Sequence, residues 1–162
     1  MPLITFEGYD GCGKSTQAKR LAARLEKWGI RLAVLRELGG TVIGEAIRHL
    51  LQYSEDNQAM TPETELLLFQ ASRSQLVRER VQPALRRGEW VIRDRMEEES
   101  DEFHERVIRA YRELAENEPR RVILIDGRIS PDTIENQIWD TFAQRFPNLE
   151  KHQTPKSKLQ KS

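Results

Sequence analysis

The stretch Gly8-Tyr9-Asp10-Gly11-Cys12-Gly13-Lys14-Ser15 decides the fold of this chain. It fits the pattern G-x-x-x-x-G-K-[ST], follows an apolar run of β-prone residues at 3–6, and precedes a segment with helical spacing of apolar residues. In such a strand, loop and helix, the glycines let successive backbone N–H groups point inward at phosphate oxygens, and the helix N-terminus adds partial positive charge. The pattern therefore predicts a loop that binds the phosphates of a nucleotide, and the flanking elements argue against a chance glycine turn.

Each polar residue of this loop has a predicted role. Lys14 would reach the β- and γ-phosphates of ATP, and the Ser15 hydroxyl would ligate Mg²⁺. The predicted ATP-binding residues are Gly8, Tyr9, Asp10, Gly11, Cys12, Gly13, Lys14, Ser15 and Thr16.

Length and charge limit the classes of partner. The 162 residues predict one domain, and 26 basic residues balance 26 acidic ones. The four lysines of 151–162 leave 22 basic residues against 26 acidic ones in 1–150. Because this body is mildly acidic, the phosphate site must be local, and no broad basic surface for nucleic acid is expected.

The chain has one cysteine, Cys12, so it can form no intramolecular disulfide, which indicates a reducing compartment. Its N-terminus has no basic region followed by a long apolar run, and nowhere do about 18 apolar residues run together. We therefore expect a cytoplasmic protein that does not bind a membrane.

Apolar runs alternate with segments of helical periodicity. Buried strands are predicted at 3–6, 32–35, 90–92 and 122–125, and helices at 41–51, 61–85 and 101–116 and from Ser130-Pro131 onward. This alternation predicts an α/β fold with a mainly parallel sheet. The expected domain is 1–148, and the polar, basic stretch 149–162 is expected to be a disordered tail.

Four motifs, in order and at matching spacing, resemble bacterial thymidylate kinase. They are Phe6–Gln17, Arg36–Thr41, Glu65–Arg73 and Arg87–Arg95. The resemblance implies the three-layer P-loop NTPase fold of nucleoside-monophosphate kinases. It also implies a phosphotransferase that converts ATP and dTMP to ADP and dTDP for dTTP biosynthesis, with Mg²⁺ as cofactor.

The resemblance also implies residue roles. Asp10 would accept a hydrogen bond from the deoxyribose 3′-hydroxyl, Phe69 would stack on thymine, and Arg73 would reach the base carbonyl. Read without the resemblance, Phe69 also fits a core position and Arg73 a solvated helix position. The implied dTMP-binding residues are Asp10, Arg36, Glu37, Phe69, Arg73 and Arg95, and the implied catalytic residues are Lys14, Asp94 and Arg95.

Two carboxylates compete for the metal. Asp94 and Asp126 each follow an apolar run, at the sheet edge where open α/β folds place ligands. We favour Asp94, together with Ser15, because the resemblance places a metal-organising Asp there. By pattern alone Asp126 is a rival metal carboxylate, and we interpret it as a turn residue at a strand end.

The chain departs from the family after Arg93-Asp94-Arg95. The family inserts further helices, a central strand and an arginine-bearing lid at this point, whereas here the sequence continues directly into 96–103. Gly11 places the chain among relatives that rely on lid arginines, so Arg93 or Arg95 is the candidate to supply that charge.

The shortening has consequences for fold and function. We expect 122–125 to pair with 3–6 in place of the lost strand, giving four parallel strands, and failure of that pairing would refute the hypothesis. Apolar helix faces should be exposed, and a homodimer through the helices at 41–51 and 61–85 would cover them. The alternative function is a nucleotide-binding remnant that holds ATP without phosphoryl transfer.

Overall fold

A computed structural model describes residues 2–8, 11–54, 59–95 and 101–147. Its helices and strands alternate along the chain as the sequence predicts. In order they are β1 (Leu3–Phe6), α1 (Lys14–Lys27), β2 (Leu32–Glu37), α2 (Val42–Tyr53), α3 (Pro62–Leu76), the π-helical turn η2 (Val77–Val81), α4 (Gln82–Arg86), β3 (Trp90–Arg95), α5 (Asp101–Asn117) and α6 (Pro131–Arg145).

The helix starts follow from local chemistry. Thr41, Thr61 and Ser130 each cap a helix, because the side-chain oxygen accepts a hydrogen bond from the backbone N–H three residues later. Pro62 and Pro131 occupy first helical positions, where the missing N–H has no cost. These predicted starts are confirmed.

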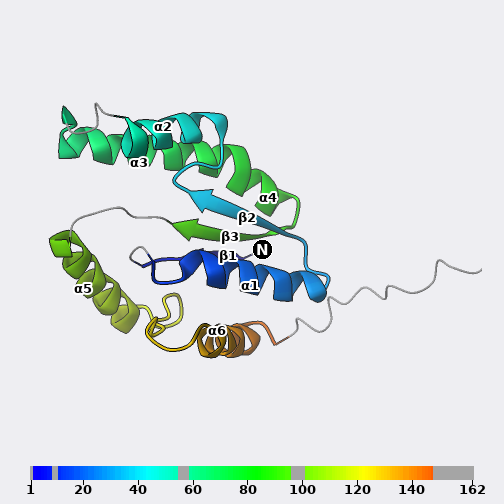
Figure 1. Ribbon diagram of the computed structural model, residues 1–162. Helices are drawn as coiled ribbons and strands as arrows, with labels where there is room; N and C mark the ends of the chain where they lie inside the picture. The colour runs from blue at the N-terminus through cyan, green and yellow to red at the C-terminus, as the bar shows by residue number, and fades with distance from the viewer. Residues whose placement is uncertain (1, 9–10, 55–58, 96–100, 148–162) are drawn as a thin grey trace, which may run out of the picture.

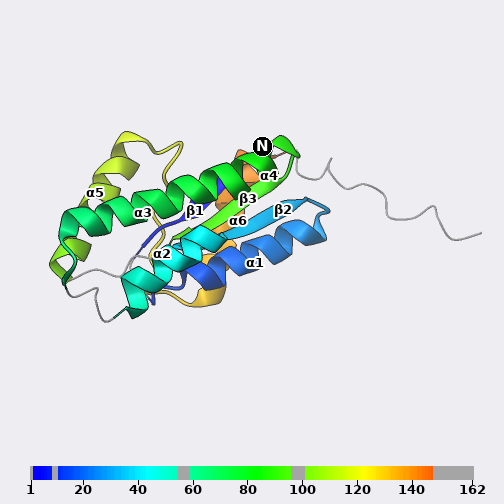
Figure 2. The same ribbon diagram turned by 90° about the horizontal axis from the view of Figure 1, so that it is seen from above.

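Helices α3, η2 and α4 continue one another as a single rod that covers one face of the sheet (Figure 2). Pro83 lies inside this rod, and proline has no N–H to give to the preceding turn. The π-helical turn just before it widens the backbone, which lets the helix continue past the proline.

The sheet is parallel, with strand order β1-β3-β2. Helices α2, α3 and α4 lie on one side of it, and α1 and α6 on the other (Figure 1). Successive residues of the central strand face opposite layers, so Val91 packs with α3 and α4 while Ile92 packs with α1 and α6. Both side chains are fully buried, which makes β3 the centre of the core.

Helix α6 packs against α1 and contacts it through hydrogen bonds, ion pairs and aromatic rings. Gln17 Nε2 donates to the Pro131 carbonyl at 2.8 Å, and Arg20 forms ion pairs with Asp132 and Glu135 at the start of α6. Further along, the rings of Trp28 and Trp139 lie 5.8 Å apart. Helices α1 and α6 therefore form one packed layer on this side of the sheet.

The predicted fourth strand is wrong: the described residues form three strands, and 122–125 is irregular. The backbone N–H groups of Arg121 and Val122 both donate to the Glu118 carbonyl, and these bonds form a turn directly after α5. In both views α5 stands beyond the strand ends and does not lie against the sheet (Figures 1 and 2). Because a crossover helix must pack on the sheet to return the chain to its edge, Ile123 and Leu124 stay largely exposed and do not pair with β1.

The α/β fold with a parallel sheet is confirmed. The expected exposure of apolar helix faces is also confirmed on α2 and α3, where large side chains meet solvent. These are Val42, Ile43, Leu50, Tyr53, Leu66 and Leu67. In the described part of the chain, no helix has the length and apolarity that crossing a bilayer would require. The predicted tail at 149–162 lies outside the described residues, so the domain boundary stays a prediction.

Candidate functional site

The loop between β1 and α1 depends on glycine conformations. Gly8, Gly11 and Gly13 all have positive φ, at 145°, 78° and 91°, values that side chains disfavour. A Cβ on Gly8 would lie 2.9 Å from Cys12 Sγ, whereas a Cβ on Gly11 or Gly13 would meet nothing within 4 Å. Space is therefore open beside Gly11 and Gly13, and the strand, loop and helix have the predicted order. Tyr9 and Asp10 lie outside the described residues.

Lys14 is the first residue of α1 and is buried although it is charged. Its Nζ donates to Gly8 O at 2.6 Å, so the side chain spans the loop from one end to the other. Helix α1 has Gly13 as its N-cap, which offers no side chain to the first helical N–H groups. An ammonium group and uncapped helix N–H groups therefore face the same loop, the arrangement that favours a phosphate.

Ser15 and Asp94 meet although 79 positions separate them. The Ser15 hydroxyl donates to Asp94 Oδ2. The other carboxylate oxygen, Oδ1, is buried and has no hydrogen-bond partner among the described residues. A buried carboxylate beside a hydroxyl suits a hard cation such as Mg²⁺, which prefers oxygen ligands and takes few of them from protein. The residues present therefore fit the implied metal.

The rival carboxylate, Asp126, is engaged elsewhere. Its two oxygens accept hydrogen bonds from the backbone N–H, Nε and Nη2 of Arg128. The guanidinium and then the backbone N–H of Arg128 lower the pKa of Asp126 to about 2. Because both oxygens already hold donors in an exposed turn, the contacts favour Asp94 over Asp126 as the metal carboxylate.

On the other face of the sheet, a second cluster of charges forms around Glu37 at the end of β2. Arg73 Nε of α3 donates to Glu37 Oε1 at 2.5 Å, and Arg93 Nη1 of β3 lies 2.9 Å from Glu37 Oε2. The Glu37 side chain is only 3% exposed. The Arg73 side chain is partly exposed, and Phe69, one turn earlier on α3, is half-buried and belongs to neither core cluster.

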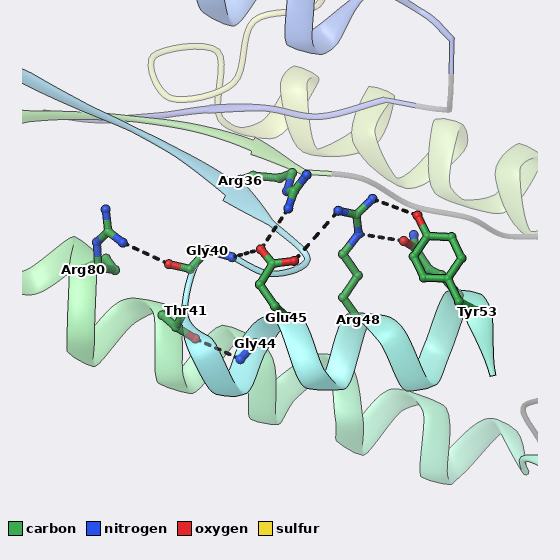
Figure 3. A network of polar contacts seen from close by, with 9 residues as sticks. Arg36, Gly40, Thr41, Gly44, Glu45, Arg48, Tyr53 and Arg80 are labelled. Carbon is green, nitrogen blue, oxygen red and sulfur yellow. Dashed lines mark hydrogen bonds and ion pairs between the residues drawn. The ribbon is translucent and has the colours of Figure 1, made fainter.

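The glycine turn between β2 and α2 is held by one carboxylate, as Figure 3 shows. Glu45 Oε1 accepts hydrogen bonds from Gly40 N and Arg36 Nη2, both at 2.8 Å, while Arg48 approaches Oε2 at 4.0 Å. The Gly40 N–H, and then Arg36, lower the pKa of Glu45. Arg80 Nη1 donates to the Gly40 carbonyl, so the turn is tied to the helix rod as well.

The structure thus brings the predicted site residues together in two groups. Lys14, Ser15 and Asp94 gather at the phosphate loop, and Glu37, Phe69 and Arg73 lie on the α3 side. Arg36 is turned toward Glu45. The side chain of Arg95, at the end of β3, lies outside the described residues, so its implied role stays a prediction.

Sequence reasoning missed the contacts made by Glu45 and Arg93, and it missed the bond from Tyr111 of α5 to Glu7 after β1. Glu45 follows the Thr41 cap by four residues, and an acid in the first helical turn was a signal that it could reach back to the preceding loop. No sequence pattern pointed to the Tyr111 contact, which joins residues 104 positions apart.

Comparisons with known proteins agree with this geometry. The family model described as thymidylate kinase matches residues 6–97. A thymidylate kinase of Chlorobium luteolum is 56% identical over 93 residues, which are 57% of this chain and 42% of that protein. The matched region of this chain therefore corresponds to less than half of the length of that relative.

A longer alignment covers most of the chain. A thymidylate kinase of Bradyrhizobium sp. is 31% identical over 204 positions, covering 88% of this chain and 90% of that protein. Because 204 positions exceed the 162 residues of this chain, that relative carries residues with no counterpart here.

The fold agrees as well. A crystal structure of thymidylate kinase from Ehrlichia chaffeensis superimposes with a TM-score of 0.74 at 26% identity, covering 87% of this chain and 97% of that one. With the family motifs in sequence, the phosphate loop in place and these three relatives in agreement, the chain belongs to the thymidylate kinase family.

Proposed function

We propose that this protein transfers the γ-phosphoryl group of ATP to dTMP, giving ADP and dTDP. One observation carries the proposal: Lys14, Ser15 and Asp94 converge on the loop between β1 and α1. Family membership supports dTMP as the acceptor. Since the acceptor phosphate oxygen is already anionic, the reaction needs no general base, and the site has to neutralise charge and align the two nucleotides.

Each residue then has one task. Lys14 exchanges its bond to Gly8 O for phosphate oxygens and neutralises part of their charge. Ser15 and Asp94 would hold Mg²⁺, which when bound screens the charge of the phosphates. On the α3 side, Phe69 would stack on the thymine ring and Arg73 would donate to its carbonyl, contributing about 1–3 kcal/mol for the stacking.

A second function, ATP binding without useful transfer, is favoured by a specific observation. Arginines that stabilise a transferring phosphoryl group are worth about 10³–10⁵ in rate. Among the described contacts, Arg36, Arg73 and Arg93 are each held by a carboxylate away from the phosphate loop. Transfer would then depend on Lys14, on Mg²⁺ and on Arg95.

A coupled assay of ADP release with ATP, Mg²⁺ and dTMP tests the two functions, run beside a direct titration of ATP binding. Turnover that requires dTMP and disappears in Lys14→Ala supports the kinase. ATP binding with no turnover supports the remnant. No binding of ATP or ADP in the presence of Mg²⁺ would refute both.

We also propose that the exposed apolar faces of α2 and α3 pair in a homodimer. Leu66 and Leu67 are 59% and 68% exposed on adjacent positions of α3, and Val42 of α2 is 84% exposed. Large exposed apolar patches on a protein surface mark interaction sites. Sedimentation equilibrium tests the proposal: the wild type should be a dimer and Leu67→Glu a monomer, and a monomeric wild type would refute it.

A further inference from the structure

Among the implied dTMP-binding residues whose side chains the structure describes, Glu37 is the one that is almost inaccessible. Its side chain is 3% exposed, and each carboxylate oxygen faces a different guanidinium group, Oε1 that of Arg73 and Oε2 that of Arg93. The three residues come from β2, α3 and β3, so the carboxylate joins three elements at the carboxyl end of the sheet. Oε1 accepts a hydrogen bond from Arg73, whereas Oε2 is paired with Arg93 by charge at 2.9 Å and has no hydrogen-bond partner among the described residues. A buried carboxylate between two guanidinium groups is poorly placed for direct contact with an anionic nucleotide.

The contact to Arg73 is made through a particular nitrogen. Glu37 accepts a hydrogen bond from Nε, so the two terminal nitrogens of the guanidinium take no part in this contact. Among the described residues, Glu37 is the one hydrogen-bond and ion-pair partner of Arg73. A guanidinium is planar, so fixing Nε also fixes the plane in which the terminal N–H groups point. The Arg73 side chain is 26% exposed, and among the described residues its terminal nitrogens have no hydrogen-bond partner.

Arg93 is held on the same side. Neighbouring residues of a strand point to opposite faces, and Asp94 contacts Ser15 on the α1 face. Arg93 therefore lies on the α3 face with Glu37 and away from the phosphate loop. This placement weakens Arg93 as the substitute for a lid arginine and gives it a different task, which is to balance the second oxygen of Glu37.

We propose that Glu37 is a positioning residue: it fixes the guanidinium of Arg73 so that its terminal N–H groups meet the base of the acceptor nucleotide, and Arg93 keeps the carboxylate in place. The proposal rests on the proposed function, because it assigns the acceptor base to the α3 side of the sheet. It predicts that losing Glu37 impairs the acceptor site without impairing the phosphate loop.

The central test is binding of dTMP and ADP to Glu37→Gln, measured by calorimetry. The variant should bind dTMP about 10- to 100-fold more weakly, since a misaligned group acts like a missing one. Its affinity for ADP should stay within about twofold. Arg73→Ala should lose the same amount of dTMP affinity. The double variant Glu37→Gln/Arg73→Ala should lose no more dTMP affinity than either single variant, because the two residues act through one contact.

A matched control is Glu135→Gln, which removes a carboxylate from an ion pair between α6 and α1. It should change neither affinity. If Glu37→Gln does not fold, Glu37→Met/Arg93→Met replaces the buried pair with apolar side chains of similar length, a change that folded proteins often tolerate. It should fold and still lose dTMP affinity, because Arg73 is released.

Three outcomes would overturn the proposal. These are wild-type dTMP affinity in both Glu37 variants, equal loss of ADP and dTMP affinity, and additive losses in the double variant with Arg73. NMR of the Arg73 Nε–H separates this failure from failure of the proposed function. A slowly exchanging Nε–H that is lost in Glu37→Gln would confirm the contact in a protein that binds no dTMP. That result would refute the proposed function, and with it the role of Glu37 at the acceptor site.

Discussion

Replacing Ile92 with Ala should reveal how much of the stability resides in the central strand. Ile92 is fully buried on β3 and packs with α1 and α6. Truncating a buried Ile to Ala costs about 2–5 kcal/mol, and helices and strands on every side limit collapse, so we expect about 3 kcal/mol. For a chain of this size, that loss lowers Tm by roughly 6–12 °C. Urea unfolding followed by circular dichroism measures the free energy, and calorimetry measures Tm.

The matched control is Val34→Ala. Val34 pairs with Ile92 in register, but it lies on β2 at the edge of the sheet and is 47% exposed. It should cost about 0.5–1 kcal/mol. If the two variants lose similar free energy, or Ile92→Ala loses less than 1 kcal/mol, then α1 and α6 do not close a core over β3 and the layered arrangement is wrong.

Three further predictions concern the turn before α2 and the start of α3. Gly44→Ala should destabilise by about 1–3 kcal/mol in chemical unfolding, against the usual gain of Ala in a helix, because its Cβ would lie 2.8 Å from Gly39 O; a stabilised variant would contradict this. The pKa of Glu45 is lowered first by the Gly40 N–H, so its contribution to stability is present above the ordinary value of 4.5 and is lost as pH falls below it. Glu45→Gln should therefore reduce the fall in Tm on acidification, and an unchanged pH profile would count against the contact. Thr61→Ala should cost about 1 kcal/mol in urea unfolding through the lost helix cap, whereas Thr61→Asn should cost little, and equal losses would exclude a capping role.

Local signals in the sequence were sufficient for most of the fold. The strand at 3–6 and the helix after the loop follow from the pattern of apolar residues. The loop between them follows from its glycines, which adopt a positive φ that other residues disfavour. Helix starts at Thr61-Pro62 and Ser130-Pro131 follow from capping chemistry in the same way. The family motifs assigned Ser15 and Asp94 to one metal site, and their side chains form a hydrogen bond, while the metal role itself stays a prediction.

The failure at 122–125 has a non-local cause. The run Val122-Ile123-Leu124-Ile125 has every local property of a buried strand. Whether such a run pairs depends on where the preceding helix leaves the chain, and α5 does not lie on the sheet. The contacts of Glu37 were missed for a related reason, since its two partners lie 36 and 56 positions away and no spacing rule links them.

ATP binding and phosphoryl transfer make different demands on the site. Lys14, Ser15 and Asp94 are the proposed groups for the phosphates and the metal, and of these only Lys14 carries positive charge of its own. Rate requires a positive charge that meets the transferring group more closely in the transition state. Arg93 cannot supply this charge while Glu37 holds it on the α3 face. The distinction between a kinase and an ATP-binding remnant therefore depends on Arg95, whose position at the end of β3 directs the first activity measurement to Arg95→Ala.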